Sequence, residues 1–115
     1  SGSKVIVESN IFEEFLDKAL SIGENSDVLL RDNSFKQNLR AITVKDGSSA
    51  YILDNEFNKN TYDLSLYIKK RFYKEPKIYI NSKVSGLSIN NQLKEKLNSV
   101  NMLTSESIIS KYEER

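Results

Sequence analysis

The stretch Lys77–Arg115, KIYINSKVSGLSINNQLKEKLNSVNMLTSESIISKYEER, decides which fold the sequence predicts. In its first residues Ile78 and Ile80 alternate with Tyr79, which is typical of a half-buried strand. Met102-Leu103 is a second apolar run, too short for a helix. Val84, Leu87 and Ile89 around Gly86 suggest a further short strand or an edge segment. We therefore expect one or two short strands, a helix, a very short strand at Met102 and a final helix.

The two helices of this stretch are predicted from apolar spacing and capping residues. Leu93, Leu97 and Val100 recur at i, i+4 and i+7, which places them on one face of a helix. Thr104 and Ser105 are good N-caps for the closing helix. Strands and helices that alternate so closely predict a small sheet with helices packed on it.

The N-terminal region predicts an amphipathic helix in front of that sheet. Lys4–Glu8 reads as a strand or an ordered lead-in, Ser9 or Asn10 as a helix cap and Gly23 as the residue that ends the helix. The apolar face of the helix consists of Phe12, Phe15, Leu16, Ala19 and Leu20. We expect this helix to cover an apolar face of the domain.

The middle of the chain predicts a hairpin and a further helix. Leu39–Lys45 alternates like a strand, Asp46-Gly47 suits a hairpin turn, and Ala50–Leu53 suits the return strand. A helix is expected over Tyr62–Tyr73. Asp27–Arg31 is a further short apolar run. No internal repeat is expected.

The composition excludes several kinds of site. The chain has 115 residues, enough for one domain, and neither cysteine nor histidine. Disulfides, thiolate metal sites and the commonest general base are therefore ruled out. No phosphate loop or nucleophile motif occurs. We expect a protein that is not an enzyme and uses no cofactor and no metal, and that spans no membrane, because no apolar run is long enough.

From Leu39 onward the predicted order of elements resembles that of a BRCT domain: strand, helix, two strands, helix, strand, helix. The residues that carry the resemblance are the helix at 91–97, the strand Asn101-Met102-Leu103 and the start of the last helix at Thr104. The usual tryptophan of the last helix is absent, and so is the usual Gly-Gly before the second strand. A single BRCT domain behind a packed helix resembles the helix-BRCT modules of silent-chromatin regulators.

The expected fold class is therefore α/β, with a small, mostly parallel sheet flanked by helices. Residues 1–3 are typical of a cloning scar, 4–26 form the N-terminal extension, and 27–115 form the BRCT-like domain. The resemblance also implies a non-enzymatic module that docks a short linear peptide, in unmodified or phosphorylated form, from a chromatin-associated partner. A nuclear location is implied with it, and a cytoplasmic one otherwise.

The candidate binding residues come from two sources. The resemblance places a phosphate pocket between the end of the first strand and the second helix, although Asp46 would repel a phosphate there. The second source is the excess of basic residues between positions 69 and 83, interleaved with aromatic residues. The candidates are Lys45, Gly47, Ser48 and Lys94 for the pocket, and Lys69, Arg71, Lys74, Lys83 and Tyr79 for the basic cluster.

Other interpretations of these residues stay open. Asp46-Gly47 is equally a plain turn, and Lys94 and the basic cluster are equally the solvated faces of helices. The cluster also suits a nucleic-acid backbone, and a small phage- or plasmid-type inhibitor protein is a third alternative. The net charge is only +1, which favours a localised anionic partner over wrapped nucleic acid.

Overall fold

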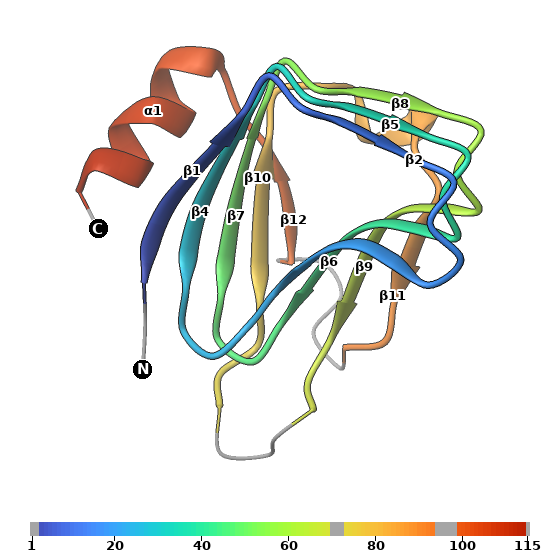
Figure 1. Ribbon diagram of the computed structural model, residues 1–115. Helices are drawn as coiled ribbons and strands as arrows, with labels where there is room; N and C mark the ends of the chain where they lie inside the picture. The colour runs from blue at the N-terminus through green and yellow to red at the C-terminus, as the bar shows by residue number, and fades with distance from the viewer. Residues whose placement is uncertain (1–2, 70–72, 94–98, 115) are drawn as a thin grey trace.

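The computed structural model describes residues 3–69, 73–93 and 99–114. Within these ranges the chain winds into a solenoid of parallel strands (Figure 1). Sheet A contains β1 (Lys4–Glu8), β4 (Asp27–Arg31), β7 (Ser49–Leu53), β10 (Lys77–Ile80) and β12 (Val100–Met102). Sheet B contains β2 (Ile11–Glu13), β5 (Ser34–Lys36) and β8 (Glu56–Asn58). Sheet C contains β3 (Lys18–Ile22), β6 (Arg40–Lys45), β9 (Tyr62–Tyr67) and β11 (Ile89–Asn91).

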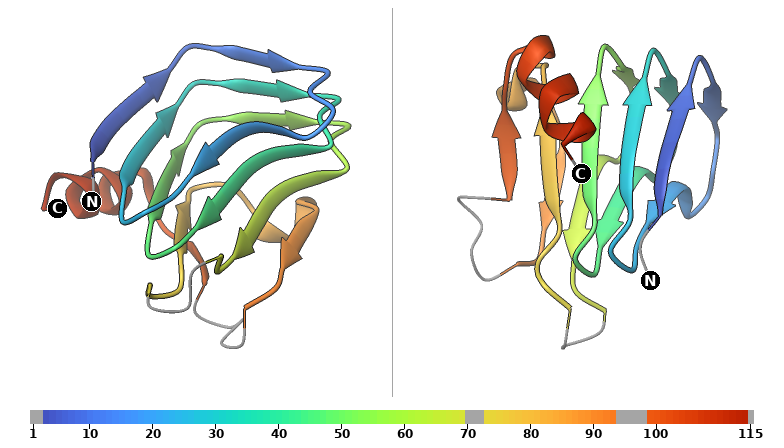
Figure 2. Two further views of the ribbon diagram at one scale, coloured as in Figure 1. Left: turned by 60° about the horizontal axis from the view of Figure 1, so that its bottom comes forward. Right: turned by 90° about the vertical axis from the view of Figure 1, so that its left-hand side faces the viewer.

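The first three coils of the solenoid each pass through the three sheets in turn (Figure 2). The first coil is β1, β2 and β3, and equivalent residues of successive coils lie 22 or 23 positions apart. The third coil is longer, because residues 68–76 separate β9 from β10. In the fourth coil the short 3-10 helix η1 (Val84–Gly86) stands between β10 and β11.

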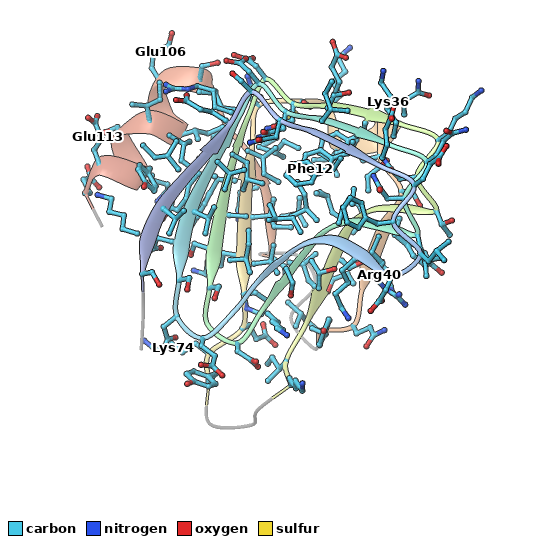
Figure 3. The ribbon with its side chains drawn as sticks, viewed as in Figure 1. Phe12, Lys36, Arg40, Lys74, Glu106 and Glu113 are labelled. Atoms are coloured by element: carbon cyan, nitrogen blue, oxygen red, sulfur yellow. The ribbon has the colours of Figure 1, made fainter. Side chains whose placement is uncertain are left out.

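The interior is filled by one apolar row from each sheet. Val28 of β4 and Ala50 of β7 are in register, and their side chains face the core. Sheet B contributes Phe12, Phe35 and Phe57, whose rings stack with centroids 4.9 and 5.5 Å apart. Figure 3 shows Phe12 pointing into the space between the sheets. Burying these rows supplies the main stabilisation of the fold.

Residues with positive φ bend the chain at the corners between sheets. Ser9, Asp32 and Asp54 have φ of 59°, 56° and 56° and occupy the same corner in successive coils. Such backbone conformations cost about 1–2 kcal/mol for residues other than glycine. The corners must therefore be held by other interactions.

The asparagine ladder, formed by Asn10, Asn33 and Asn55, holds this corner. The side-chain oxygen of Asn33 accepts hydrogen bonds from the backbone N–H and the side-chain amide of Asn10 at 3.0 and 3.2 Å. Asn33 and Asn55 then donate to the carbonyl oxygens of Val7 and Leu30 in the preceding coil. The ladder thus satisfies the backbone groups that the turn removes from the strand pairing.

α1 (Ser105–Glu113) packs outside the solenoid, on sheet A (Figure 1). Ile108 and Tyr112 contact Leu29, Tyr51 and Leu53, which form the outward apolar row of the sheet. The hydroxyl of Thr104 accepts a hydrogen bond from the Ser107 N–H, as the sequence predicted for the N-cap.

The predicted α/β class and the BRCT resemblance are wrong. The strands within each sheet are parallel, as predicted. Neighbouring strands of one sheet are joined through turns and through strands of the other sheets, whereas the predicted class requires connecting helices. Ile42 lies in sheet C, whereas β10 and β12 lie in sheet A, so these segments do not share one sheet. The phosphate pocket that the resemblance implied loses its basis, because the order of strands and helices on which it rested does not occur in the described residues.

Two predicted helices are strands. The region expected to be a helix over 10–23 forms β2 and β3, and the Tyr62–Tyr73 region begins with β9. The apolar spacing of Phe12, Phe15 and Leu16 imitates a helical face because a corner separates Phe12 from the other two. Of the helix predicted around Leu97, residues 94–98 lie outside the described residues, and Val100 belongs to β12.

The structure contains the predicted turn at Asp46-Gly47, but the strands on either side of it do not form a hairpin. Both residues have positive φ, and the Ser48 N–H donates to the Lys45 carbonyl. The turn joins β6 to β7, which belong to different sheets and do not pair with each other. The strands expected over Leu39–Lys45, Ala50–Leu53 and Lys77–Asn81 are confirmed as β6, β7 and β10.

Replacement of Asn33 by alanine should destabilise the protein strongly. Asn33→Ala removes the bonds to the Asn10 amides, the Val7 carbonyl and the Asn55 side chain, so we expect a loss of about 2–4 kcal/mol in the free energy of unfolding. Urea unfolding of the variant and the wild type measures this loss in the free energy of unfolding. The control Asn58→Ala alters an exposed side chain and should change this free energy by less than about 0.5 kcal/mol. Equal effects of the two substitutions would contradict the role of the ladder.

Candidate functional site

A cleft of about 860 Å³ lies on the outer face of sheet A, beside α1. Its floor is the start of β7 and β10, where Ser49, Tyr51, Lys77 and Tyr79 point away from the core. One wall is the C-terminal part of α1, and the other comprises Gly47 and residues 73–75. We call this site the tyrosine–lysine cleft.

Tyrosine rings form the floor of the cleft. Tyr79 stacks on Tyr51 with ring centroids 5.2 Å apart, and Tyr112 meets Tyr51 edge-on at 5.4 Å. Tyr51 is almost completely buried, whereas Tyr79 is partly exposed at the surface. The register of β7 and β10 places Tyr51 and Tyr79 side by side, so the parallel sheet itself orients this floor.

Three lysines surround the floor, and all three are exposed: Lys74, Lys77 and Lys111. The Nζ of Lys111 lies 5.0 Å from the centre of the Tyr79 ring, a cation–π distance. None of the three lysines forms an ion pair with a carboxylate among the residues that the structure describes. Two carboxylates, Glu75 and Glu114, also line the cleft. The cleft therefore combines an aromatic floor with a small excess of positive charge.

Contacts at both ends of α1 fix this wall of the cleft. The Tyr112 hydroxyl donates to the Val5 carbonyl at 3.2 Å and links the last helix to the first strand. At the other end the side-chain amide of Asn81 donates to the Ser105 hydroxyl at 3.1 Å. Because α1 is held at both ends, Lys111 has a defined position over Tyr79.

The structure brings three of the predicted binding residues together in this cleft: Gly47, Lys74 and Tyr79. Figure 3 shows Lys74 beside the amino ends of the sheet A strands. At Gly47 φ is +72°, and a Cβ there would clash with the side-chain oxygen of Asn25. The turn thus requires glycine at position 47, and Gly47 forms part of the cleft wall.

The other predicted residues lie elsewhere. Ser48 is buried, and its hydroxyl accepts a hydrogen bond from the Ser26 N–H, which is a structural role. Lys45 lies at the end of β6, with its Nζ 6.0 Å from the centre of the Tyr67 ring. Lys69 donates its backbone N–H to the buried Asp46 carboxylate, and Lys83 is exposed next to η1. Arg71 and Lys94 lie outside the described residues.

Sequence analysis did not identify Lys111 as a binding residue. It sits on the closing helix, 32 positions after Tyr79, and no motif connects the two. Lys77 belongs to the basic stretch, and the alternation along the strand places it on the same face as Tyr79, but it was not among the predicted residues. For Lys111 the sequence offers no signal.

Two further properties concern the described residues only. They contain no group of three or more aspartate, glutamate, histidine or cysteine side chains placed to hold a metal ion. None of their helices is both long and apolar enough to cross a bilayer.

Comparison with known proteins gives one match. A family model described as "Right handed beta helix region" matches residues 1–92. No curated protein and no solved structure matches the chain. The family match agrees with the solenoid and contradicts the BRCT resemblance, so the roles in chromatin silencing and the nuclear location that rested on that resemblance lose their basis.

The contact between Tyr112 and the first strand should make stability depend on pH in the alkaline range. Burial, and secondarily the Asp27 carboxylate, raises the pKa of Tyr112. The unfolded chain then loses this proton first, at a pKa of about 10. The contribution of Tyr112 is therefore complete below pH of about 10 and is lost as the pH rises through the higher folded-state pKa.

Tyr112→Phe tests this by urea unfolding at a series of pH values between 8 and 11. The wild type should be more stable than the variant at pH 8, by about 1 kcal/mol for the lost hydrogen bond. The difference should shrink above pH of about 10. A constant difference for Tyr112→Phe across this pH range would show that the hydroxyl is not buried against sheet A.

Proposed function

The chain belongs to the right-handed β-helix family, and we propose that it is a non-enzymatic binding module that holds an extended acidic peptide in the tyrosine–lysine cleft. The observation that supports this most directly is the arrangement of Lys74, Lys77 and Lys111 around Tyr79. These ammonium groups have no carboxylate partner in the described structure, so an anionic ligand does not have to displace an existing ion pair.

The chemistry of the cleft suits acidic side chains on an extended backbone. Lysine ammonium groups bind carboxylates and phosphates as point charges and do not demand a planar geometry. The Tyr79 ring offers a flat apolar surface on which a peptide group or a side-chain stem can pack. Aspartate, glutamate and phosphoserine share this anionic chemistry, so the peptide can carry either kind of group.

The sheet gives the cleft a rigid base. Ser49, Tyr51, Lys77 and Tyr79 lie on paired parallel strands, and their backbone geometry is set by the solenoid. A preformed site loses little conformational entropy when it binds a ligand. A partner therefore meets an almost complete surface, in which only the lysine side chains need to order.

A peptide is favoured over a nucleic-acid backbone for two reasons. The chain has a net charge of only +1, whereas nucleic-acid-binding domains usually carry a strong basic surface. Glu75 and Glu114 also line the cleft and would oppose a continuous row of phosphates. Single acidic side chains, in contrast, can approach the lysines and avoid both carboxylates.

The test measures the affinity of a ten-residue Asp/Glu-rich peptide containing one tyrosine, and of the same peptide with phosphoserine in place of aspartate. Lys77→Ala and Lys111→Ala should each weaken binding about two- to fivefold, as for exposed ion pairs. Tyr79→Ser should weaken it about tenfold, because the aromatic platform is lost. Thermal unfolding of each variant verifies that the fold is retained.

Lys83→Ala is the matched control, because Lys83 is an exposed lysine next to η1 that does not line the cleft. This variant should bind the peptide as the wild type does. An equal loss for Lys83→Ala would show that only overall charge matters. If a short single-stranded DNA binds more tightly than the peptide, with an affinity that falls steeply as the salt concentration is raised, the ligand of the cleft is a nucleic-acid backbone and the peptide proposal is wrong.

A further inference from the structure

We propose that the outer face of sheet C carries a second binding site, which takes a small tetrahedral oxyanion, namely phosphate in free form or as a monoester. The site is a cavity of about 240 Å³, which we call the sheet C cavity. Its lining comes from all four strands of the sheet: Lys18, Arg40, Ser65, Tyr67, Asn90 and, directly after β11, Gln92. It shares no residue with the tyrosine–lysine cleft, and Figure 3 shows Arg40 on the side of the solenoid away from α1.

A row of small polar side chains forms the floor of the cavity. Leu64 and Leu66 of β9 face the core, so Ser65 between them points outward. Thr43 of β6 and Asn90 of β11 are the register partners of Ser65, one on either side. Because β6 and β9 each pair with a strand on both sides, this floor lies inside the sheet and away from its edges.

The two hydroxyl groups of this floor are buried and have no hydrogen-bond partner among the residues that the structure describes. Ser65 is 1% exposed and Thr43 is 0% exposed. A buried hydroxyl that gives up its bonds to water and gains none in exchange destabilises the fold. Because Ser65 lines the cavity, a ligand oxygen at its base would accept the hydrogen bond that the protein leaves unmade.

Longer side chains stand on both sides of the floor. Lys18 and Arg40 are in register with each other and come before the floor row along the strands. Tyr67 comes two residues after Ser65, and Gln92 directly follows β11. A volume of about 240 Å³ suits a ligand of a few heavy atoms, since pockets for drug-sized ligands measure about 300–1,000 Å³.

The charged groups of the lining select an anion. Lys18 and Arg40 line the cavity, whereas none of the described carboxylates does. Asp17 contacts both cations from beside the cavity, Lys18 at 3.4 Å and Arg40 at 3.5 Å, and its own side chain is 72% exposed. Ion pairs with so exposed a partner are weak, so an anion in the cavity can compete with Asp17 for the two cations.

The number and placement of the donors favour phosphate over a carboxylate. The Ser65 hydroxyl lies at the floor, the Asn90 and Gln92 amides lie along β11, and the two cations stand on the other side. A carboxylate presents two oxygens in one plane, whereas a phosphate group presents three or four in different directions. The guanidinium group of Arg40 can also bind two phosphate oxygens at once.

The test titrates the intact protein with inorganic phosphate, glycerol 3-phosphate and acetate at constant ionic strength, and follows the NMR signals of the Asn90 and Gln92 side-chain amides. We expect saturable shifts of these signals with at least one of the two phosphates, and binding of acetate about tenfold weaker. The phosphate that binds more tightly shows whether the ligand is free or esterified. Absence of saturable binding for both phosphates, or an equal affinity for acetate, would overturn the proposal.

Ser65→Ala should weaken phosphate binding about tenfold, because it removes one hydrogen bond to a charged group. The hydroxyl has no partner within the described protein, so this variant should unfold at the wild-type temperature or above it. Ser34→Ala is the matched control, because the Ser34 hydroxyl on β5 is also buried without a partner among the described residues but belongs to sheet B. It should bind phosphate as the wild type does, and an equal loss for the two serine variants would contradict the role of Ser65.

Two charge variants have opposite expected effects. Arg40→Gln should weaken phosphate binding about tenfold, whereas Asp17→Asn should strengthen it about two- to fivefold because the competing carboxylate is gone. A folding defect cannot account for tighter binding. Lys59→Gln alters an exposed lysine outside the cavity and should leave the affinity unchanged. A loss with Lys59→Gln as large as with Arg40→Gln would show that only net charge matters and would overturn the proposal.

Discussion

Side-chain amides at the corners are the constraint on which this fold depends. The first three coils each leave sheet A and enter sheet B within a few residues, and they do so through residues with positive φ, among them Asp32 and Asp54. Such a turn interrupts the pairing of backbone groups between coils. Asn33 and Asn55 replace the lost pairing with their own side chains, and both are buried. The ladder therefore sets the register that stacks the phenylalanine rings and the apolar rows beneath it.

The same register produces the outer surface. When equivalent residues of successive coils lie side by side, every outward position becomes a row of neighbouring side chains across the sheet. On sheet A this row consists of apolar and aromatic residues, among them Leu29, Tyr51 and Tyr79, and α1 covers part of it. The tyrosine–lysine cleft is the part of the row that α1 leaves open. Its binding properties follow from the solenoid, with one lysine added by the helix.

The first and the last described coils have different neighbours. At the C-terminal side the chain turns away after β12 and places α1 against the flank of sheet A. At the N-terminal side the first coil repeats the asparagine and phenylalanine of the later coils but has no described neighbour. Its Phe15 takes the position of Asn38, and its ring centroid lies 6.5 Å from that of Phe12.

By itself the sequence determined several local features: the strands around Ile42, Ile52 and Ile78, the turn at Asp46-Gly47 and the Thr104 cap. Alternation and capping depend on neighbouring residues only, so these features can be read without the fold. The repeat of asparagine and phenylalanine at 22 or 23 positions is also present in the sequence and would have predicted the solenoid. This repeat is hard to recognise because most other positions of the coil vary. In addition, the corners give residues such as Phe12 and Leu16 a spacing like that of the apolar face of a helix.

Tertiary structure alone decided which residues share a surface. Lys111 and Tyr79 meet because α1 folds back onto sheet A, and Gly47 and Lys74 join them because successive coils begin at the same edge. Such juxtapositions arise from stacking between distant segments, and no local pattern encodes them.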